Sequence, residues 1–125
     1  MPGKLEFGKA AEKEAAEFLK TKGYKIIHRN YKTKLGEIDI IAEHKKVICF
    51  IEVKARHSLY LGEPQEAVSE KKQRQISKVA LYYLKTNRLL NRPARFDVLA
   101  LLYMHNLPKI SLITNAFELN ANFTL

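Results

Sequence analysis

Residues 47–54 read Val-Ile-Cys-Phe-Ile-Glu-Val-Lys, and this stretch decides the fold. One face of the predicted strand carries only apolar side chains, at Val47, Cys49, Ile51 and Val53. The other face begins with Ile48 and Phe50, and a strand that is apolar on both faces is typical of the middle of a covered sheet. This second face then continues into Glu52 and Lys54, which point the same way because they are two residues apart. A buried strand therefore ends in two opposite charges.

A third charge lies in the preceding apolar run, Gly36–Ala42 (GEIDIIA), where Asp39 is flanked by isoleucines. An unpaired buried charge is too costly to keep, so Asp39, Glu52 and Lys54 need partners. A salt bridge from Lys54 to either acid would serve the fold alone, and an isolated Glu-x-Lys favours that interpretation. An acid on a neighbouring strand and a basic chain favour a functional site instead, with a divalent metal between the acids.

Such a site has the groups that phosphodiester hydrolysis needs. Mg²⁺ takes hard oxygen ligands and keeps several waters, so one or two carboxylates suffice to bind it. We expect Asp39 and Glu52 to hold Mg²⁺ or Mn²⁺, with the main-chain carbonyl of Val53 as a further candidate ligand. Lys54 would orient or deprotonate the attacking water, or stabilise developing negative charge.

Net charge points to a polyanionic partner. The chain has 22 Lys and Arg against 13 Asp and Glu, a net charge of +9, and nucleic acid is the leading candidate for its partner. Six basic residues and no acid lie between Lys20 and Lys34, and a second basic group begins the predicted long helix. The candidate nucleic-acid contacts are Arg56, Lys72, Arg74 and Tyr60. We expect Lys72 and Arg74 to contact phosphates, although either one alone is equally compatible with an ordinary surface side chain. Tyr60 is expected to stack on unpaired bases.

At 125 residues the chain predicts one domain, 1–125, that can bury a core without disulfides. The single cysteine, Cys49, suits a reducing cytoplasm and is best explained as a core residue. No apolar run is long enough to cross a bilayer, and the N-terminus lacks an apolar signal core. We therefore expect a cytoplasmic protein that does not bind a membrane.

The pattern of apolar residues predicts two helices and five strands. Helices are expected at 5–22 and 65–86, and strands at 24–31, 36–43, 46–55, 95–103 and 109–113. The strands at 36–43 and 46–55 are close enough to form an antiparallel hairpin, and residues 115–125 are expected to be irregular. The strand at 95–103 also carries one acid, Asp97. This order of elements predicts an α/β fold with a central mixed sheet flanked by helices.

Together these residues resemble the bacterial YraN family over nearly the whole chain. The matching positions are Gly8, Glu12, Gly23-Tyr24, Asn30, Gly36–Asp39, Glu52–Arg56, Gly62, Glu66–Val68, Lys72, Arg95–Val98 and Asn115–Phe117. The Asp39…Glu52-x-Lys54 pattern also resembles the signature of restriction-endonuclease-like nucleases. The resemblance implies a restriction-endonuclease-like fold related to archaeal Holliday-junction resolvases. It also implies a predicted endonuclease activity and an additional acidic site residue, Glu12.

The residues alone leave the roles of two acids undecided. Spacing cannot distinguish Glu12 from Glu14 and Glu17, which share its helix, and only the resemblance favours Glu12. Glu37 shares a strand face with Asp39, but it could equally pair with Lys34 or Arg56 at the rim.

The sequence thus favours a metal-dependent endonuclease that acts on DNA, including branched or structured DNA, and a two-fold homodimer would suit a two-fold junction. The rival hypotheses are a nucleic-acid-binding module that keeps the fold without cutting, and a basic domain that binds an acidic protein.

Overall fold

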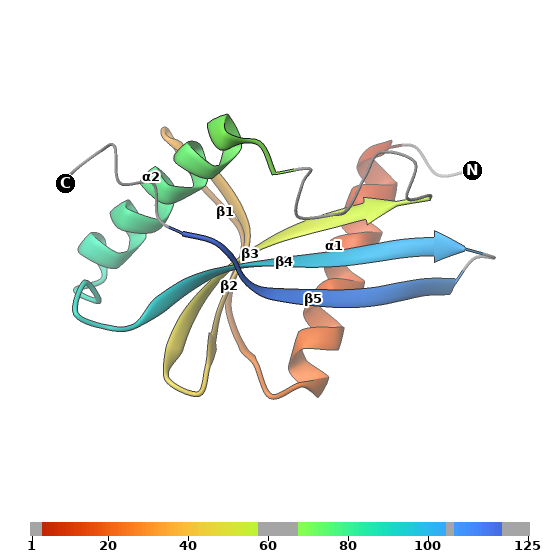
Figure 1. Cartoon of the computed structure of the whole chain (residues 1–125), viewed down its shortest axis with the longest axis horizontal. Helices are drawn as coiled ribbons and strands as arrows, with labels where there is room; N and C mark the ends of the chain where they lie inside the picture. Colours follow the sequence, from red (N-terminus) through yellow and green to blue (C-terminus); the bar gives the residue numbers. More distant parts are fainter. Residues whose placement is uncertain (1–3, 58–67, 105–106, 119–125) are drawn as a thin grey trace.

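The computed structural model describes residues 4–57, 68–104 and 107–118. Its elements are, in chain order, α1 (Lys4–Thr21), β1 (Lys25–Thr33), β2 (Gly36–His44), β3 (Val47–Arg56), α2 (Glu70–Thr86), β4 (Ala94–Met104) and β5 (Leu107–Phe117). The strands form one twisted sheet in the order β1-β2-β3-β4-β5 (Figure 1). Strands β3 and β4 are parallel and the other neighbours are antiparallel, so the sheet is mixed.

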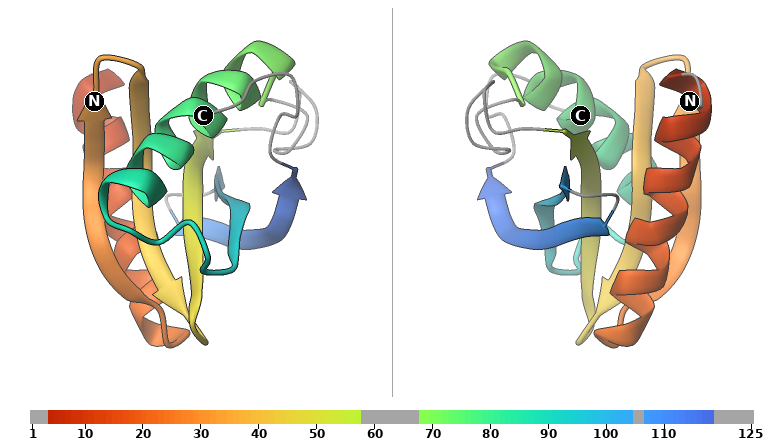
Figure 2. Two further views of the ribbon diagram at one scale, coloured as in Figure 1. Left: turned by 90° about the vertical axis from the view of Figure 1, so that its left-hand side faces the viewer. Right: turned by 90° about the vertical axis from the view of Figure 1, so that its right-hand side faces the viewer.

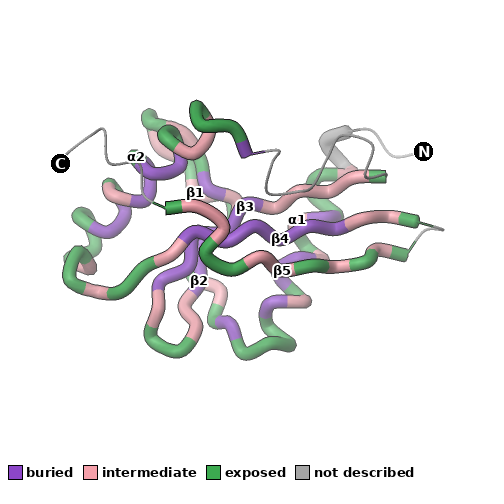
Figure 3. The backbone as a smooth tube through the Cα atoms, viewed as in Figure 1, coloured by how far each residue is buried: buried purple, intermediate pink, exposed green. Residues whose placement is uncertain are grey.

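The sheet lies between the two helices, with α1 against one face and α2 against the other (Figure 2). Val79 and Tyr83 of α2 pack with Phe50 in one apolar core, and Ala15 and Leu19 of α1 belong to the other. The buried parts of the strands lie at the centre of the sheet, where β2, β3 and β4 are covered on both faces (Figure 3). The predicted α/β class, with a mixed sheet flanked by helices, is confirmed, and the arrangement is consistent with a restriction-endonuclease-like fold.

The predicted hairpin of β2 and β3 is present, and its turn is unusual. Lys45 and Lys46 connect the strands, and both have positive φ angles, 50° and 69°. Two successive left-handed residues match the twist of a two-residue hairpin, although Asn and Gly usually occupy these positions. Neither of the described helices is long and apolar enough to span a membrane.

The largest differences from the predicted boundaries are at α2 and β5. Helix α2 begins at Glu70 rather than at residue 65, because Ser69 is its N-cap and accepts a hydrogen bond from the Lys72 main-chain N–H. Strand β5 reaches from Leu107 to Phe117, so the strand expected at 109–113 was too short at both ends. Residues 115–117, which were expected to be irregular, belong to this strand. Residues 119–125, which belong to the segment expected to be irregular, lie outside the described residues.

Candidate active site

The candidate site lies where β2 and β3 stop pairing. The ladder between these strands runs from the His44–Val47 pair to the Ile40–Ile51 pair. Beyond it, the main-chain N–H of Val53 donates a hydrogen bond of 2.8 Å to Oδ2 of Asp39. A side-chain carboxylate therefore bonds to the backbone of the neighbouring strand just beyond the last paired residues. This contact fixes Asp39 beside Glu52 and Lys54.

The alternation of side chains along β2 breaks at the same point. Residues two apart on a regular strand share a face, yet Ile38 packs in the core under α2 and Ile40 packs in the core under α1. Asp39 lies between them, so the alternation changes at the candidate acid itself. The sequence could not reveal this change, because both isoleucines are simply buried.

All four residues predicted as catalytic, Glu12, Asp39, Glu52 and Lys54, line one open cleft of about 490 Å³. The cleft is formed by α1, β1, β2 and β3, and the other residues that line it are Phe7, Gly8, Lys9, Ala11, Asn30, Lys32, Glu37, Val53 and Ala55. Residues from four separate elements thus converge on one concave surface that is open to solvent. The charged residues of its lining are four acids, Glu12, Glu37, Asp39 and Glu52, and three lysines, Lys9, Lys32 and Lys54.

The carboxyl groups of Asp39 and Glu52 lie next to each other. Burial, and next the neighbouring carboxylate of Glu52, raise the pKa of Asp39 from 3.8 to about 8. The Val53 N–H and the charge of Lys72 act in the opposite direction. Glu52 itself is only 8% exposed. Two carboxylates forced together away from water keep a proton between them at neutral pH unless a cation takes its place.

This donor set fits a divalent ion. Asp39 and Glu52 offer hard carboxylate oxygens, which Mg²⁺ and Mn²⁺ prefer, and binding a cation would remove the repulsion that holds the proton. Within the described residues, no group of three or more His, Cys, Asp or Glu is close enough to form a complete protein cage. Mg²⁺ does not require such a cage, because it is usually held by one or two carboxylates and keeps several waters.

Glu12 is the helical acid that faces the cleft. Burial raises its pKa, as does the charge of nearby Asp39, while Asn30 and Arg29 lower it. The other two candidates on α1 lie elsewhere. Glu17 is exposed and pairs with Lys20 at 3.9 Å. Glu14 lies near Tyr103, whose pKa is raised to about 12 by burial and by this carboxylate.

Lys54 lines the cleft without a salt bridge to either acid. The three ion pairs found among the described residues are Lys20–Glu17, Arg92–Glu43 and Arg95–Asp97. The described structure therefore does not contain the alternative, an ion pair of Lys54 with Asp39 or Glu52 that serves only the fold. Glu37 is exposed and lines the cleft, and those ion pairs likewise do not join it to Lys34 or Arg56.

The predicted nucleic-acid contacts are spread more widely. Lys72 is half-buried in the first turn of α2. Its charge lowers the pKa of Asp39, so this end of the helix lies near the cleft. Arg74 is exposed on the same helix. Arg56 is half-buried at the end of β3, just beyond the residues that line the cleft. Tyr60 falls in 58–67, outside the described residues.

Asn30 also lies in the cleft, and the sequence did not predict a role for it. It lies on β1 between the pairs Arg29–Ile40 and Tyr31–Ile38, which places it across from Asp39. Its φ is 54°, a left-handed backbone that Asn tolerates better than most residues. It lines the cleft, and its side chain lowers the pKa of Glu12. The available signal was an Asn inside a strand, where this residue type is uncommon.

Asp97, the acid on β4, has a structural role. Its side chain is completely buried, and it accepts hydrogen bonds from Nε of Arg95 at 3.0 Å and from the main-chain N–H of Asn115 at 2.8 Å. Arg95 also donates to the Tyr24 hydroxyl at 2.7 Å. The register of β4 and β5 shifts beside Asp97, so this carboxylate holds the irregular part of β5 in place.

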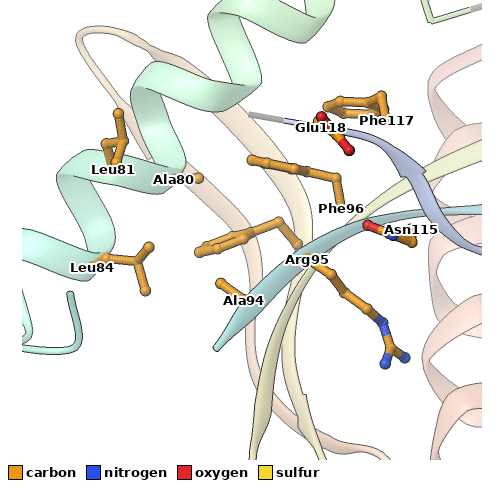
Figure 4. A pocket seen from close by; sticks show the side chains of 10 residues that line it. Ala80, Leu81, Leu84, Ala94, Arg95, Phe96, Asn115, Phe117 and Glu118 are labelled. Carbon is orange, nitrogen blue, oxygen red and sulfur yellow. The ribbon is translucent and has the colours of Figure 1, made fainter. Parts of the chain in front are cut away.

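A second cavity, of about 200 Å³, lies between α2 and the strands β4 and β5 (Figure 4). Leu81, Leu84, Phe96 and Phe117 give it an apolar lining, and Arg95 points away from it. Glu118 is the one acid that lines it, and no lysine, histidine or cysteine does so among the described residues. The cavity therefore lacks the paired carboxylates of the cleft.

Comparison with known proteins identifies the family. A model of the uncharacterised protein family UPF0102 matches residues 11–101. A UPF0102 protein of Caldicellulosiruptor saccharolyticus is 46% identical over 117 residues, which cover 91% of this chain and 98% of the relative. Relatives from Syntrophus aciditrophicus and Geotalea uraniireducens, both UPF0102 proteins, are 47% and 49% identical over 95% and 90% of this chain and 94% and 89% of their own lengths. YraN is another name for the same family. These matches show that the chain belongs to the UPF0102 family.

Proposed function

We propose that this protein is a metal-dependent endonuclease that hydrolyses phosphodiester bonds in DNA. The observation that carries the proposal is the convergence of Glu12, Asp39, Glu52 and Lys54 in one open cleft. Glu52 is buried, Asp39 is half-buried, and Lys54 has no ion-pair partner among the described residues. Such a group of charges has little value for stability. The same arrangement suits a reaction in which negative charge develops on a phosphate.

Asp39 and Glu52 would hold Mg²⁺ or Mn²⁺, with the Val53 carbonyl as a further candidate ligand. When bound, such an ion supplies Lewis acidity and offsets the negative charge that builds up on the phosphate. Lys54 would orient the attacking water or stabilise the developing charge, from its place beside Glu52 on β3. Glu12 would assist from α1, and Asn30 would help to position it.

The basic surface supports a nucleic-acid substrate. The net charge of +9 attracts a polyanion at long range. Lys72 is well placed to contact a phosphate next to the cleft, and Arg74 and Arg56 would extend the contacts without reading the base sequence. Branched DNA and a two-fold dimer belong to the same proposal, since a symmetric junction offers two equivalent strands to two copies of the site.

The test is a cleavage panel of linear, flapped and four-way DNA with Mg²⁺ or Mn²⁺. We expect nicking by the wild-type protein, its loss in Asp39→Asn and Lys54→Ala, and retained DNA binding by both variants. The matched controls are Glu17→Gln and Lys109→Ala, which change the same charges at exposed positions away from the cleft. Cleavage that survives in both cleft variants would come from another site or a contaminant. Binding without cleavage of any substrate would favour the rival, a non-catalytic nucleic-acid-binding module.

A further inference from the structure

Helix α2 carries a line of exposed side chains that the proposed cleavage site does not use. Its members are Lys71, Gln75, Lys78, Tyr82 and Lys85, and all five are exposed. Their spacings alternate between four and three residues, which places them on one face of the helix. The opposite face, with Ile76, Val79 and Tyr83, is buried against the sheet. The exposed line extends over about 21 Å at the usual helical rise.

The charge of this helix is not balanced. After Glu70 at its first position, α2 contains no acid, and the chain has none until Asp97. A helix whose lysines only aid solubility usually intersperses them with glutamates at i, i+4. The three ion pairs of the described residues do not include any residue of α2. Its lysines are therefore available to a partner that brings negative charge.

Aromatic side chains lie beside these lysines. Tyr82 is 46% exposed. On the neighbouring strand β1, the ring of Tyr31 meets buried Tyr83 edge-on at 5.3 Å, and exposed His28 lies 5.2 Å from Tyr31. Burial, and next the neighbouring Tyr82, raise the pKa of Tyr31, so the two tyrosines are close. Rings from α2 and β1 thus form one aromatic surface.

This surface begins beside the cleft. Gln75 lies directly over Gly36 at the start of β2, because a Cβ atom on that glycine would come within 2.7 Å of the Gln75 Cγ atom. Lys72, one turn earlier, lies close enough to Asp39 for its charge to lower the pKa of that acid. Tyr82 is ten residues beyond Lys72, or about 15 Å along the helix. A chain that enters the cleft can therefore continue over α2.

We propose that Tyr82, Tyr31 and His28, with Lys71, Lys78 and Lys85, form a binding platform for single-stranded nucleic acid. Lysines at helical spacing contact successive phosphates, and exposed rings stack on unpaired bases. A duplex fits the surface less well, because its bases are already stacked on one another. The platform goes beyond the proposed cleavage site, since it binds whether or not the carboxylates cut.

The test measures binding of labelled oligothymidylate and oligouridylate of about 15 nucleotides by fluorescence anisotropy in EDTA, so that cleavage does not contribute. We expect Tyr82→Ala to weaken binding of at least one oligomer by about tenfold, and Tyr82→Phe, which keeps the ring, to bind as the wild type does. Affinity for a duplex of the same length should change by less than about twofold in Tyr82→Ala, because paired bases cannot stack on the ring. Tyr82 is half exposed, so an unchanged thermal midpoint will show that the variant is folded.

The charges are tested through the salt dependence of affinity. We expect Lys78→Ala to reduce the slope of log affinity against log salt by about 0.7, the value for one phosphate contact to a single strand. Lys109→Ala removes an equal charge from β5, at the other edge of the sheet, and should leave the slope unchanged.

Three outcomes would overturn the platform: no binding by the wild type at low salt, wild-type affinity in Tyr82→Ala, or equal effects of Lys78→Ala and Lys109→Ala. Absence of cleavage in the DNA panel would leave the platform standing and remove only the proposed nuclease.

Discussion

The Asp39 carboxylate accepts a hydrogen bond of 2.8 Å from the main-chain N–H of Val53, the residue between Glu52 and Lys54. This single bond ties the acid of one strand to the Glu-x-Lys segment of the next. It leaves the second carboxylate oxygen of Asp39 for another partner. It also restricts the rotamers of the Asp39 side chain, which a surface aspartate would sample freely.

The first prediction separates the three glutamates of α1. Glu12→Gln should lower metal-dependent cleavage about 10- to 100-fold, because it removes an acid next to Asp39 while the volume stays the same. Glu17→Gln is the matched control and should cleave as the wild type does, since Glu17 is exposed and its ion-pair partner among the described residues is Lys20. Initial rates at saturating Mn²⁺ measure both. Equal rates in the two variants would remove Glu12 from the site.

The second prediction concerns stability and pH without metal. The pKa of Asp39 is about 8 in the folded protein against an ordinary value of 3.8. The folded state therefore keeps a proton that the unfolded chain loses above about pH 4. In EDTA, the free energy of unfolding should fall as the pH rises from about 4 to 8, and this part of the fall should be missing in Asp39→Asn. Urea denaturation at several pH values measures it; parallel profiles for the two proteins would contradict the prediction.

The same proton predicts how a metal ion binds. At about pH 7 an ion that binds between Asp39 and Glu52 should displace about one proton, so affinity should rise as the pH approaches 8. Calorimetric titration of Mn²⁺ in two buffers with different heats of ionisation measures the release. Binding without proton release would place the ion elsewhere.

The third prediction concerns Gly36, the first residue of β2. Its φ of +142° is unfavourable for other residues, and a Cβ atom would meet the side chain of Gln75. Gly36→Ala should lower the free energy of unfolding by about 1–3 kcal/mol. In a Gln75→Ala background the loss should be smaller but should not disappear, because the backbone strain remains. Urea denaturation of the four proteins in this cycle measures both parts; a full rescue would mean that φ is not strained.

The fourth prediction distinguishes the structural acid from the site acids. Asp97→Ala should cost about 3–5 kcal/mol, because it leaves the Arg95 guanidinium and the Asn115 N–H without their acceptor. Asp97→Asn should cost less, and neither variant should alter the proton release on metal binding. Glu118→Gln, at an exposed position nearby, is the control for urea denaturation. A stability loss below about 1 kcal/mol in Asp97→Ala would contradict the assigned role.

Much of the fold was predictable because periodicity is a local property. The run from Val47 to Lys54 gave a central strand, and β3 is indeed buried on both faces. The short connection at Lys45 and Lys46 gave the hairpin. The start of α2 was placed too early, because the apolar pattern does not mark a boundary and Ser69 was not recognised as the cap.

The grouping of the candidate residues was predictable from the sequence, but its geometry was not. The sequence grouped Asp39, Glu52 and Lys54 because charges inside apolar runs are conspicuous, and the structure brings them to one cleft. Glu12 was favoured only by resemblance, since a helical glutamate is ordinary, and Asn30 received no role. Both depend on which surface of α1 and β1 faces the gap between β2 and β3, a tertiary fact that no local pattern encodes.

The outer strands have a consequence for how the protein behaves in concentrated solution. The ladder of β1 shifts between Ile26 and His28 and its backbone turns left-handed at Asn30, while β5 is bent beside Asp97 and left-handed at Asn115. A straight, flat border invites another chain to add itself by main-chain hydrogen bonds, and kinks of this kind discourage it. Each margin of the sheet thus carries its own built-in protection against open-ended polymerisation.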